Sequence, residues 1–272
     1  MTLNNQILSF SKYHGTGNDF IMINGFDQSF PELDSKTIQK LCHRHFGIGA
    51  DGLIILKKSS ASDFKMVYFN SDGHQATMCG NGGRSAVAFA LHSGIIKNLQ
   101  QIHFMASDGI HQAEIVSHTQ NSAIVKLGMQ DTVLPTELMP GKYFLNTGSP
   151  HLVVPVEDPT NMDVFAEGKR LRYGNELKPE GANINFISGK NSNIHVRTYE
   201  RGVENETLSC GTGVTASAIV WAWLQKLIGG TEIHTHSTGG QLTVSFDISS
   251  EGVSDIILSG PAQFVFSGTI HL

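Results

Sequence analysis

The chain has 272 residues, of which 40% are hydrophobic and 16% charged, and its formal net charge is −5. This length and composition predict one large or two ordinary globular domains with a well-buried core, and they exclude a disordered chain. The small negative charge gives no reason to expect a nucleic acid or an anionic membrane as partner. The best apolar run, residues 216–224, is far too short to span a bilayer.

The first eleven residues, Met1 to Ser11, lack a basic region followed by an apolar one. They therefore show no signal peptide. The chain has three cysteines, a small and odd number. We expect a cytoplasmic protein whose cysteines are reduced thiols rather than a disulfide framework.

The first half of the chain predicts short strands interrupted by two helices. Hydrophobic periodicity and turn residues place the strands at 7–13, 19–24, 52–56, 63–70, 101–105, 110–116 and 122–127. The helices are expected at 35–44 and 85–92, the second stopped by Gly94. Residues 128–140, with two prolines and little periodicity, are typical of a linker.

The second half repeats this plan. Strands are expected at 142–146, 151–156, 183–188 and 194–199, and helices at 162–172 and 216–224. Gly229 and Gly230 are expected to stop the second of these helices. The tail, residues 232–272, is rich in strand-like alternation.

A doubled Cys-Gly-x-Gly motif organises both halves. Cys79 begins one copy and Cys210 the other, each just before a predicted helix, and they are 131 residues apart. Three further landmarks share this offset: Gly17 with Gly148, Gly52 with Asn183, and Tyr68 with Tyr199. The shared offset predicts two similar domains related by a pseudo-twofold axis, with the two cysteines on opposite sides of one central cleft.

A cysteine at the start of a helix has two chemical assets. The helix N-terminus lowers the pKa of a nearby thiol, and its backbone N–H groups form a site for a carboxylate. Glycines after the cysteine let these amides approach a ligand closely. Two such loops predict a two-base reaction at a carbon beside a carboxylate. One sulfur takes the α-proton as a thiolate, and the other returns a proton as a thiol from the opposite face.

Four motifs resemble the signatures of the diaminopimelate epimerase family. They are the segments Lys12–Phe20, Arg44–Gly52, Asn70–Arg84 (with Met78-Cys79-Gly80-Asn81-Gly82) and Glu200–Gly213 (with Ser209-Cys210-Gly211-Thr212-Gly213). The resemblance runs from about residue 10 to the end of the chain. It implies a cofactor-independent epimerase that interconverts LL- and meso-2,6-diaminopimelate in lysine and peptidoglycan precursor synthesis.

The resemblance also implies an α+β fold of two pseudo-symmetric domains, each a curved mixed or antiparallel sheet wrapped around a central helix. The expected boundaries are residues 1–128 with a returning strand at about 263–272, and residues 129–262, with the active-site cleft between them. A homodimer is implied as well, active only with both thiols reduced. In the family, the cysteine that matches Cys210 is usually called the base for one direction, and the one that matches Cys79 the acid.

Further site residues are implied by position within the family motifs. Arg201 matches an arginine that pairs with the distal carboxylate of the substrate, which suits a planar guanidinium. Glu200 matches a residue near the substrate amino group, and His151 a histidine near the catalytic centre. Three positions match substrate-contacting asparagines and four match amide donors: Asn18, Asn70 and Asn183, and Gly80, Asn81, Gly211 and Thr212.

The chain departs from the family pattern in two places. Gly148-Ser149-Pro150-His151 stands where the family often has Gly-Asn-Pro-His. Ser149 is shorter than asparagine but can still donate and accept a hydrogen bond. Gly52 stands where some members carry a glutamine, and it could contribute only its backbone.

Other readings remain open from the residues alone. The same fold could serve a proline racemase or a PhzF-like isomerase, although proline racemases typically show a histidine where this chain has Asn81. The two cysteines could also form a thiol redox switch, but there is no CxxC motif. We expect no cofactor and no metal, because the chain has no P-loop, GxGxxG or HExxH motif, and Cys42-His43-Arg44-His45 lacks a second ligand pair. Cys42 itself is expected in the core.

Overall fold

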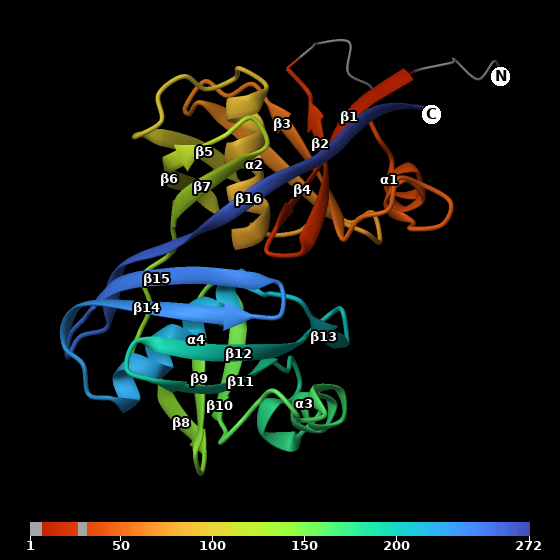
Figure 1. Cartoon of the computed structure of the whole chain (residues 1–272). Helices are drawn as coiled ribbons and strands as arrows, with labels where there is room; N and C mark the ends of the chain where they lie inside the picture. Colours follow the sequence, from red (N-terminus) through yellow and green to blue (C-terminus); the bar gives the residue numbers. More distant parts are fainter. Residues whose placement is uncertain (1–6, 27–31) are drawn as a thin grey trace. The chain divides into compact units, whose positions relative to one another are not determined.

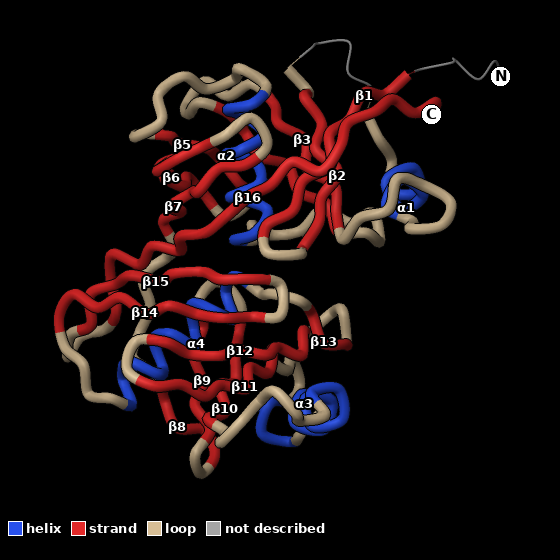
Figure 2. The backbone as a smooth tube through the Cα atoms, in the orientation of Figure 1, coloured by secondary structure: helices blue, strands red, loops and turns tan. Residues whose placement is uncertain are grey.

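A computed structural model describes residues 7–26 and 32–272 of the chain. Residues 1–6, part of the segment in which no signal peptide was predicted, lie outside the described residues. The predicted α+β class is confirmed, and strands dominate (Figure 2). The chain divides into two compact units. The first runs to Leu127 and takes in Pro261–Leu272, and the second is Gly128–Gly260.

The first unit contains a mixed sheet and two helices (Figure 1). The helices are α1 (Ser35–Cys42) and α2 (Gly80–His92). The strands follow one another in sequence order across the sheet: β1 (Ile7–Gly15), β2 (Asn18–Asn24), β3 (Gly52–Lys57), β4 (Phe64–Asn70), β5 (Ile102–Ala106), β6 (Gly109–His118) and β7 (Ser122–Gly128).

The second unit holds helices α3 (Val164–Arg172) and α4 (Gly211–Leu224) and a short 3₁₀ turn, η1 (Asn175–Leu177). Its sheet is built from β8 (Thr136–Met139), β9 (Lys142–Asn146), β10 (Pro150–Pro155), β11 (Asn183–Lys190), β12 (Asn193–Glu200), β13 (Asn205–Thr207), β14 (Gly229–Ser237), β15 (Gly240–Ile248) and the start of β16 (Val253–His271). The rest of β16 continues into the first unit, where it pairs with β1.

The strands of the two units belong to one 16-stranded sheet and repeat one pairing pattern. From β1 to β7, neighbouring strands are antiparallel, parallel, antiparallel, parallel, antiparallel and antiparallel. From β9 to β16, leaving out β13, the pattern is the same. The internal repeat inferred from sequence spacing therefore appears in the strand order of each unit.

One helix lies at the heart of each unit. Every residue of α2 from Gly80 to Ala90 is buried, and α4 is buried over most of its length. A helix that is buried on all sides is mostly apolar, as residues 214–220 are, and its few polar side chains, such as Thr215, are buried with it. The helices begin at Gly80 and Gly211, earlier than the predicted Ser85 and Ala216, because the first i→i−4 bonds already run from Gly83 and Val214 to the cysteine carbonyls.

One of three predicted boundaries is confirmed and two are wrong, the last of them in part. Gly94 does end α2, with a left-handed φ of +70°. Gly229 does not end α4: the helix closes at Leu224, and Lys226 takes the left-handed position. The predicted linker 128–140 is wrong in part, because Thr136–Met139 forms strand β8 in a hairpin with β9.

The constant offset of 131 residues fails in one strand. Leu53 pairs with Phe69, whereas Ile184, which is 131 residues after Leu53, pairs with Tyr199. By strand pairing, Tyr199 therefore corresponds to Phe69 and not to Tyr68. A one-residue difference in the strand before each cysteine loop explains the shift, since the cysteines themselves return to the common offset.

Candidate functional site

Cysteines take the place of ordinary caps at the start of the two central helices. Helices α1 and α3 are capped at their N-termini by Asp34 and Asp163, whose carboxylates each accept a hydrogen bond from a first-turn N–H group. In the described structure, Cys79 and Cys210 occupy the same N-cap position in extended conformation, and neither sulfur makes the capping hydrogen bond that the two aspartates make. The sequence thus directs two sulfur atoms and two helix N-termini to matching places in the two units.

In the first unit, Asn18 orients the group beside Cys79. Its amide nitrogen donates to Asp51 at 2.8 Å, so its oxygen faces the other way. That oxygen accepts from Cys79 Sγ at 3.6 Å and from Asn81 Nδ2 at 3.4 Å. Three of the predicted site residues are therefore brought together at the start of α2.

An ion-pair network holds Asp51 in place. Arg44 bridges Asp19 and Asp51 at 2.9 and 2.6 Å, and the buried Lys12 pairs with Asp19 at 2.8 Å. Burial alone would raise the pKa of Asp19, but the hydrogen bonds from Arg44 and Lys12 outweigh it and lower the pKa to about 2. None of these four charged residues was predicted for the site, although the quoted motifs contain all of them.

Arg84 is a further charged residue at the start of α2 that was not predicted for the site. It is fully buried, and its guanidinium donates to the Asn81 side chain at 2.8 Å and to the Gly80 carbonyl at 3.3 Å. Burial lowers its pKa to about 10, and the charge of Cys79 acts in the opposite direction. In the other unit Thr215 stands at the same offset and donates to the Gly211 carbonyl at 2.9 Å. Both side chains thus tie the first turn of a central helix.

Asn70 and Gly52 face each other in the β3–β4 register, at the strand end next to Asp51. Asn70 is exposed there, and Gly52 is buried. A side chain at Gly52 would begin 2.6 Å from both the Phe69 carbonyl oxygen and the Tyr68 ring. In this chain Gly52 therefore allows two strands to pack closely, and a glutamine would require the neighbouring strand to shift.

In the second unit, Cys210 stands at one end of a chain of hydroxyl groups. Its sulfur lies 3.5 Å from Thr212 Oγ1, which lies 3.0 Å from Ser149 Oγ. Ser149 Oγ in turn lies 3.0 Å from His151 Nε2. The serine that departs from the family pattern is thus a direct link between His151 and the start of α4.

His151 is buried completely, on β10, beneath the start of α4. Its Nδ1 lies 3.0 Å from Asn185 Nδ2, and Asn185 accepts a hydrogen bond from Thr198 at 2.9 Å. Burial, with a smaller contribution from the charge of Arg201, lowers the pKa of His151 to about 3, so the ring is neutral at pH 7. Asn185 and Thr198 were not predicted, since nothing in a strand motif marks which buried polar side chain meets the histidine.

The remaining predicted residues of this unit gather at the end of β12. Asn183 accepts from the backbone N–H of Arg201 at 2.8 Å and donates to Ser149 at 3.3 Å. Glu200 accepts from the Thr207 hydroxyl at 2.8 Å. The structure therefore joins Asn183, Ser149, His151 and Thr212 in one network, with Glu200 and Arg201 at its border.

Cys42 is a core residue, as predicted. It is 2% exposed within an apolar cluster, and burial raises the pKa of its thiol to about 12. Among residues 7–26 and 32–272, no group of three or more His, Cys, Asp or Glu side chains could hold a metal ion. Over the same residues, no helix is both long and apolar enough to cross a membrane.

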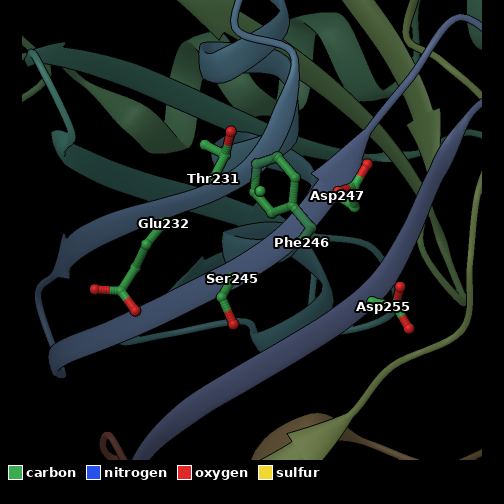
Figure 3. A pocket seen from close by; sticks show the side chains of 7 residues that line it. Thr231, Glu232, Ser245, Phe246, Asp247 and Asp255 are labelled. Carbon is green, nitrogen blue, oxygen red and sulfur yellow. The ribbon is translucent and has the colours of Figure 1, made fainter.

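A hollow on the second unit lies apart from these residues. It is lined from β14, β15 and β16, with the carboxylates of Glu232, Asp247 and Asp255 around Phe246 (Figure 3). It contains none of the predicted site residues. We assign it no role, because three acidic side chains without a further ligating group do not define a binding site.

Comparison with known proteins identifies relatives over nearly the whole chain. The family model described as diaminopimelate epimerase matches twice, at residues 10–133 and 143–265. A diaminopimelate epimerase from Flavobacterium psychrophilum is 49% identical over 260 residues, which cover 95% of this chain and 98% of that protein. One from Aquifex aeolicus is 38% identical, covering 97% of this chain and 98% of that protein.

Solved structures with the same fold are more distant in sequence. A PhzF-family phenazine biosynthesis protein from Bacillus anthracis is 16% identical, with a TM-score of 0.73 over 98% of this chain and 100% of that one. A hydroxyproline epimerase from Agrobacterium vitis is 14% identical, with a TM-score of 0.71 over 100% of this chain and 94% of that one. These likenesses establish the fold, whereas the sequence relatives confirm the resemblance drawn from the motifs.

Proposed function

The chain belongs to the diaminopimelate epimerase family, and from that premise we propose that it interconverts LL- and meso-2,6-diaminopimelate in lysine biosynthesis. It is an isomerase. The observation that carries the proposal is the repeated helix start: in each unit a cysteine replaces the usual cap of a buried central helix.

We propose that Cys79 and Cys210 are the two catalytic groups. The thiolate of one sulfur takes the α-proton, forming an S–H bond as the C–H bond breaks. The thiol of the other then gives its proton to the opposite face of the carbanion and becomes the new thiolate. The centre is inverted, the total number of protons is unchanged, and the reverse reaction exchanges the two roles. No redox step or cofactor is needed for this sequence.

The amides at the two helix starts support the proposal because the α-carbon is a weak acid. Carbanion formation places negative charge on the adjacent carboxylate. The N–H groups of Gly80 and Asn81, and of Gly211 and Thr212, belong to first turns where the helix dipole favours an anion. Removing one such donor typically costs about 3 kcal/mol of barrier height.

The other proposed substrate contacts are made by two charged side chains and three neutral ones. We propose that Arg201 binds the distal carboxylate, which a guanidinium can hold through two hydrogen bonds, and that Glu200 lies near an amino group of the substrate. Asn18, Asn70 and Asn183 would supply neutral hydrogen bonds. A substrate with two carboxylates and two amino groups matches this set better than an imino acid, which would leave Arg201 without a partner carboxylate.

We also propose that the protein acts as a homodimer in the cytoplasm, with the active site in a cleft between residues 1–128 (with the strand at about 263–272) and 129–262. Reduced thiols support the location, because a disulfide between the two cysteines would remove both the acid and the base.

The proposal is tested by incubating LL-diaminopimelate with reduced enzyme in deuterated water. We expect deuterium at one α-carbon, together with the meso isomer. trans-4-Hydroxyproline serves as the control substrate and should exchange no proton. Absence of exchange with diaminopimelate would refute the assignment.

The cysteine roles are tested by Cys79→Ser and Cys210→Ser, which should each abolish or gravely reduce turnover because a serine hydroxyl is a far weaker acid than a thiol. Cys42→Ala is the matched control, since Cys42 lies in the core and should leave turnover near the wild-type level. Turnover in either serine variant close to that of Cys42→Ala would contradict the two-thiol mechanism.

A further inference from the structure

We propose that Asn185 and His151 are positioning residues for Cys210: acting through Ser149 and Thr212, they keep a hydrogen-bond donor directed at its sulfur and so favour its thiolate form. The proposal rests on the function proposed above. It adds a series of hydrogen bonds to Cys210 that the cysteine motif alone does not contain.

We call the hydrogen-bonded series from Asn185 through His151, Ser149 and Thr212 to Cys210 the relay. The direction of its hydrogen bonds is set by Asn185. Its side-chain oxygen accepts from the Thr198 hydroxyl at 2.9 Å, so its NH₂ group is the side that faces Nδ1 of His151 at 3.0 Å. An N–H donor requires a bare nitrogen as its partner. Nδ1 of His151 therefore carries no proton, and the proton of the neutral ring is on Nε2.

Burial keeps this ring in its neutral form. His151 is 0% exposed, and the nearby positive charge of Arg201 further disfavours a second ring proton. The imidazole is consequently a fixed donor at Nε2 rather than a group that gains and loses protons near pH 7.

The direction of the next two hydrogen bonds follows because each hydroxyl group has only one proton to donate. Ser149 Oγ receives Nε2–H of His151 at 3.0 Å and an N–H of Asn183 at 3.3 Å. Its own proton is then directed to Thr212 Oγ1 at 3.0 Å. Thr212, having accepted that bond, has its hydroxyl proton for Cys210 Sγ at 3.5 Å. A thiolate is stabilised by a donor in this position.

The two cysteines differ in their surroundings. The first turn of α4 carries no acidic side chain, and the charged groups at the border of the network are Glu200, the last residue of β12, and Arg201, which follows it. The first unit has the opposite polarity, because there Cys79 donates its own proton to the Asn18 oxygen. Cys79 therefore provides a reference thiol within the same molecule, and its charge acts on the buried guanidinium of Arg84.

Thr212→Val tests the last link, with Thr212→Ser as the matched control that keeps the hydroxyl. The rate of alkylation by iodoacetamide would be measured for each cysteine by mass spectrometry from pH 6 to 9. In Thr212→Val we expect the pKa of the Cys210 thiol to rise by about one unit, which makes alkylation about tenfold slower at a fixed pH below that pKa. Cys79 should be unaffected, and Thr212→Ser should resemble the wild type. An unchanged profile of Cys210 in Thr212→Val would overturn the proposal.

Asn185→Asp tests the origin of the relay without touching either cysteine. A carboxylate accepts hydrogen bonds, so it should draw the ring proton to Nδ1 and leave Nε2 unable to donate. Nitrogen-15 NMR of histidine-labelled protein should show Nε2–H for His151 in the wild type and a protonated Nδ1 in the variant, accompanied by slower alkylation of Cys210. A wild-type ring with its proton on Nδ1 would refute the argument.

These measurements need no turnover, so the two proposals can fail separately. Normal relay behaviour without deuterium exchange into diaminopimelate would refute the proposed function. Normal exchange with an unshifted Cys210 profile in both variants would refute the relay.

Discussion

Gly213→Ala offers a sharp test of how tightly the second cysteine motif is packed. A methyl group at this position would lie 2.4 Å from Asn185 Oδ1 and 3.3 Å from both Cys210 Cβ and His151 Cε1. Carbon and oxygen atoms need about 1 Å more than the shortest of these distances. Asn185 cannot move by that amount without losing its hydrogen bond to Thr198 or His151.

The expected cost follows from these contacts. Overpacking typically costs about 1–3 kcal/mol, and a lost buried hydrogen bond about 1 kcal/mol more. The higher helix propensity of alanine offsets up to about 1 kcal/mol of this loss in the free energy of unfolding. We therefore expect Gly213→Ala to lower the free energy of unfolding by about 1–3 kcal/mol, and to slow alkylation of Cys210 because Asn185 is displaced.

The matched control is Gly82→Ala, at the same position of the first motif. There the nearest atoms, at 3.2 and 3.3 Å, are the ends of the flexible Ile54 and Met66 side chains, which can move at little cost. We expect its free energy of unfolding to stay within about 0.5 kcal/mol of the wild type. Urea denaturation followed by circular dichroism measures both variants. Equal effects of the two substitutions would refute the view that the second glycine is required by the polar network.

Three other substitutions give distinct results. The pKa of Asp19 is about 2 in the folded protein against 3.8 ordinarily, so its contribution to stability is present above pH 3.8 and is lost as the pH falls towards 2. Asp19→Asn should therefore cost on the order of 2 kcal/mol at pH 7, and the difference from wild type in urea denaturation should shrink in acid. Arg84→Met should lower the free energy of unfolding by about 2 kcal/mol, because Asn81 and the Gly80 carbonyl lose a buried donor; no loss would mean that the guanidinium is dispensable. Arg201→Lys should lower kcat/KM for diaminopimelate about tenfold or more, since lysine lacks a planar fork, and normal kinetics would remove Arg201 from the site.

Local pattern was sufficient to predict most of the fold. Alternating or continuous apolar runs give strands such as β3 and β11 directly, because their buried faces leave few alternatives. The helix starts at Gly80 and Gly211 were placed too late. Glycine has poor intrinsic helix propensity, and its use here depends on close contacts that only the folded structure contains.

The cysteine-bearing part of the candidate site could be predicted from sequence because its landmarks repeat. The supporting residues could not. Lys12, Arg44 and Asp51 carry charges that sequence alone cannot pair, and Asn185 is one of several buried polar residues in strands. Their partners are set by strand register, as the one-residue shift between β4 and β12 demonstrates.

The long strand β16 has a consequence for how this chain is made. β1 lies between β2 and the end of β16, and Ile7 pairs with His271, 264 positions further along. During synthesis β1 can join β2 early, but its other edge stays open until residues 263–271 leave the ribosome. The second unit, Gly128–Gly260, is continuous in sequence and can finish folding first. The half that is synthesised first is thus completed last, and an open strand edge on the nascent chain is a point where chaperones or neighbouring chains can bind.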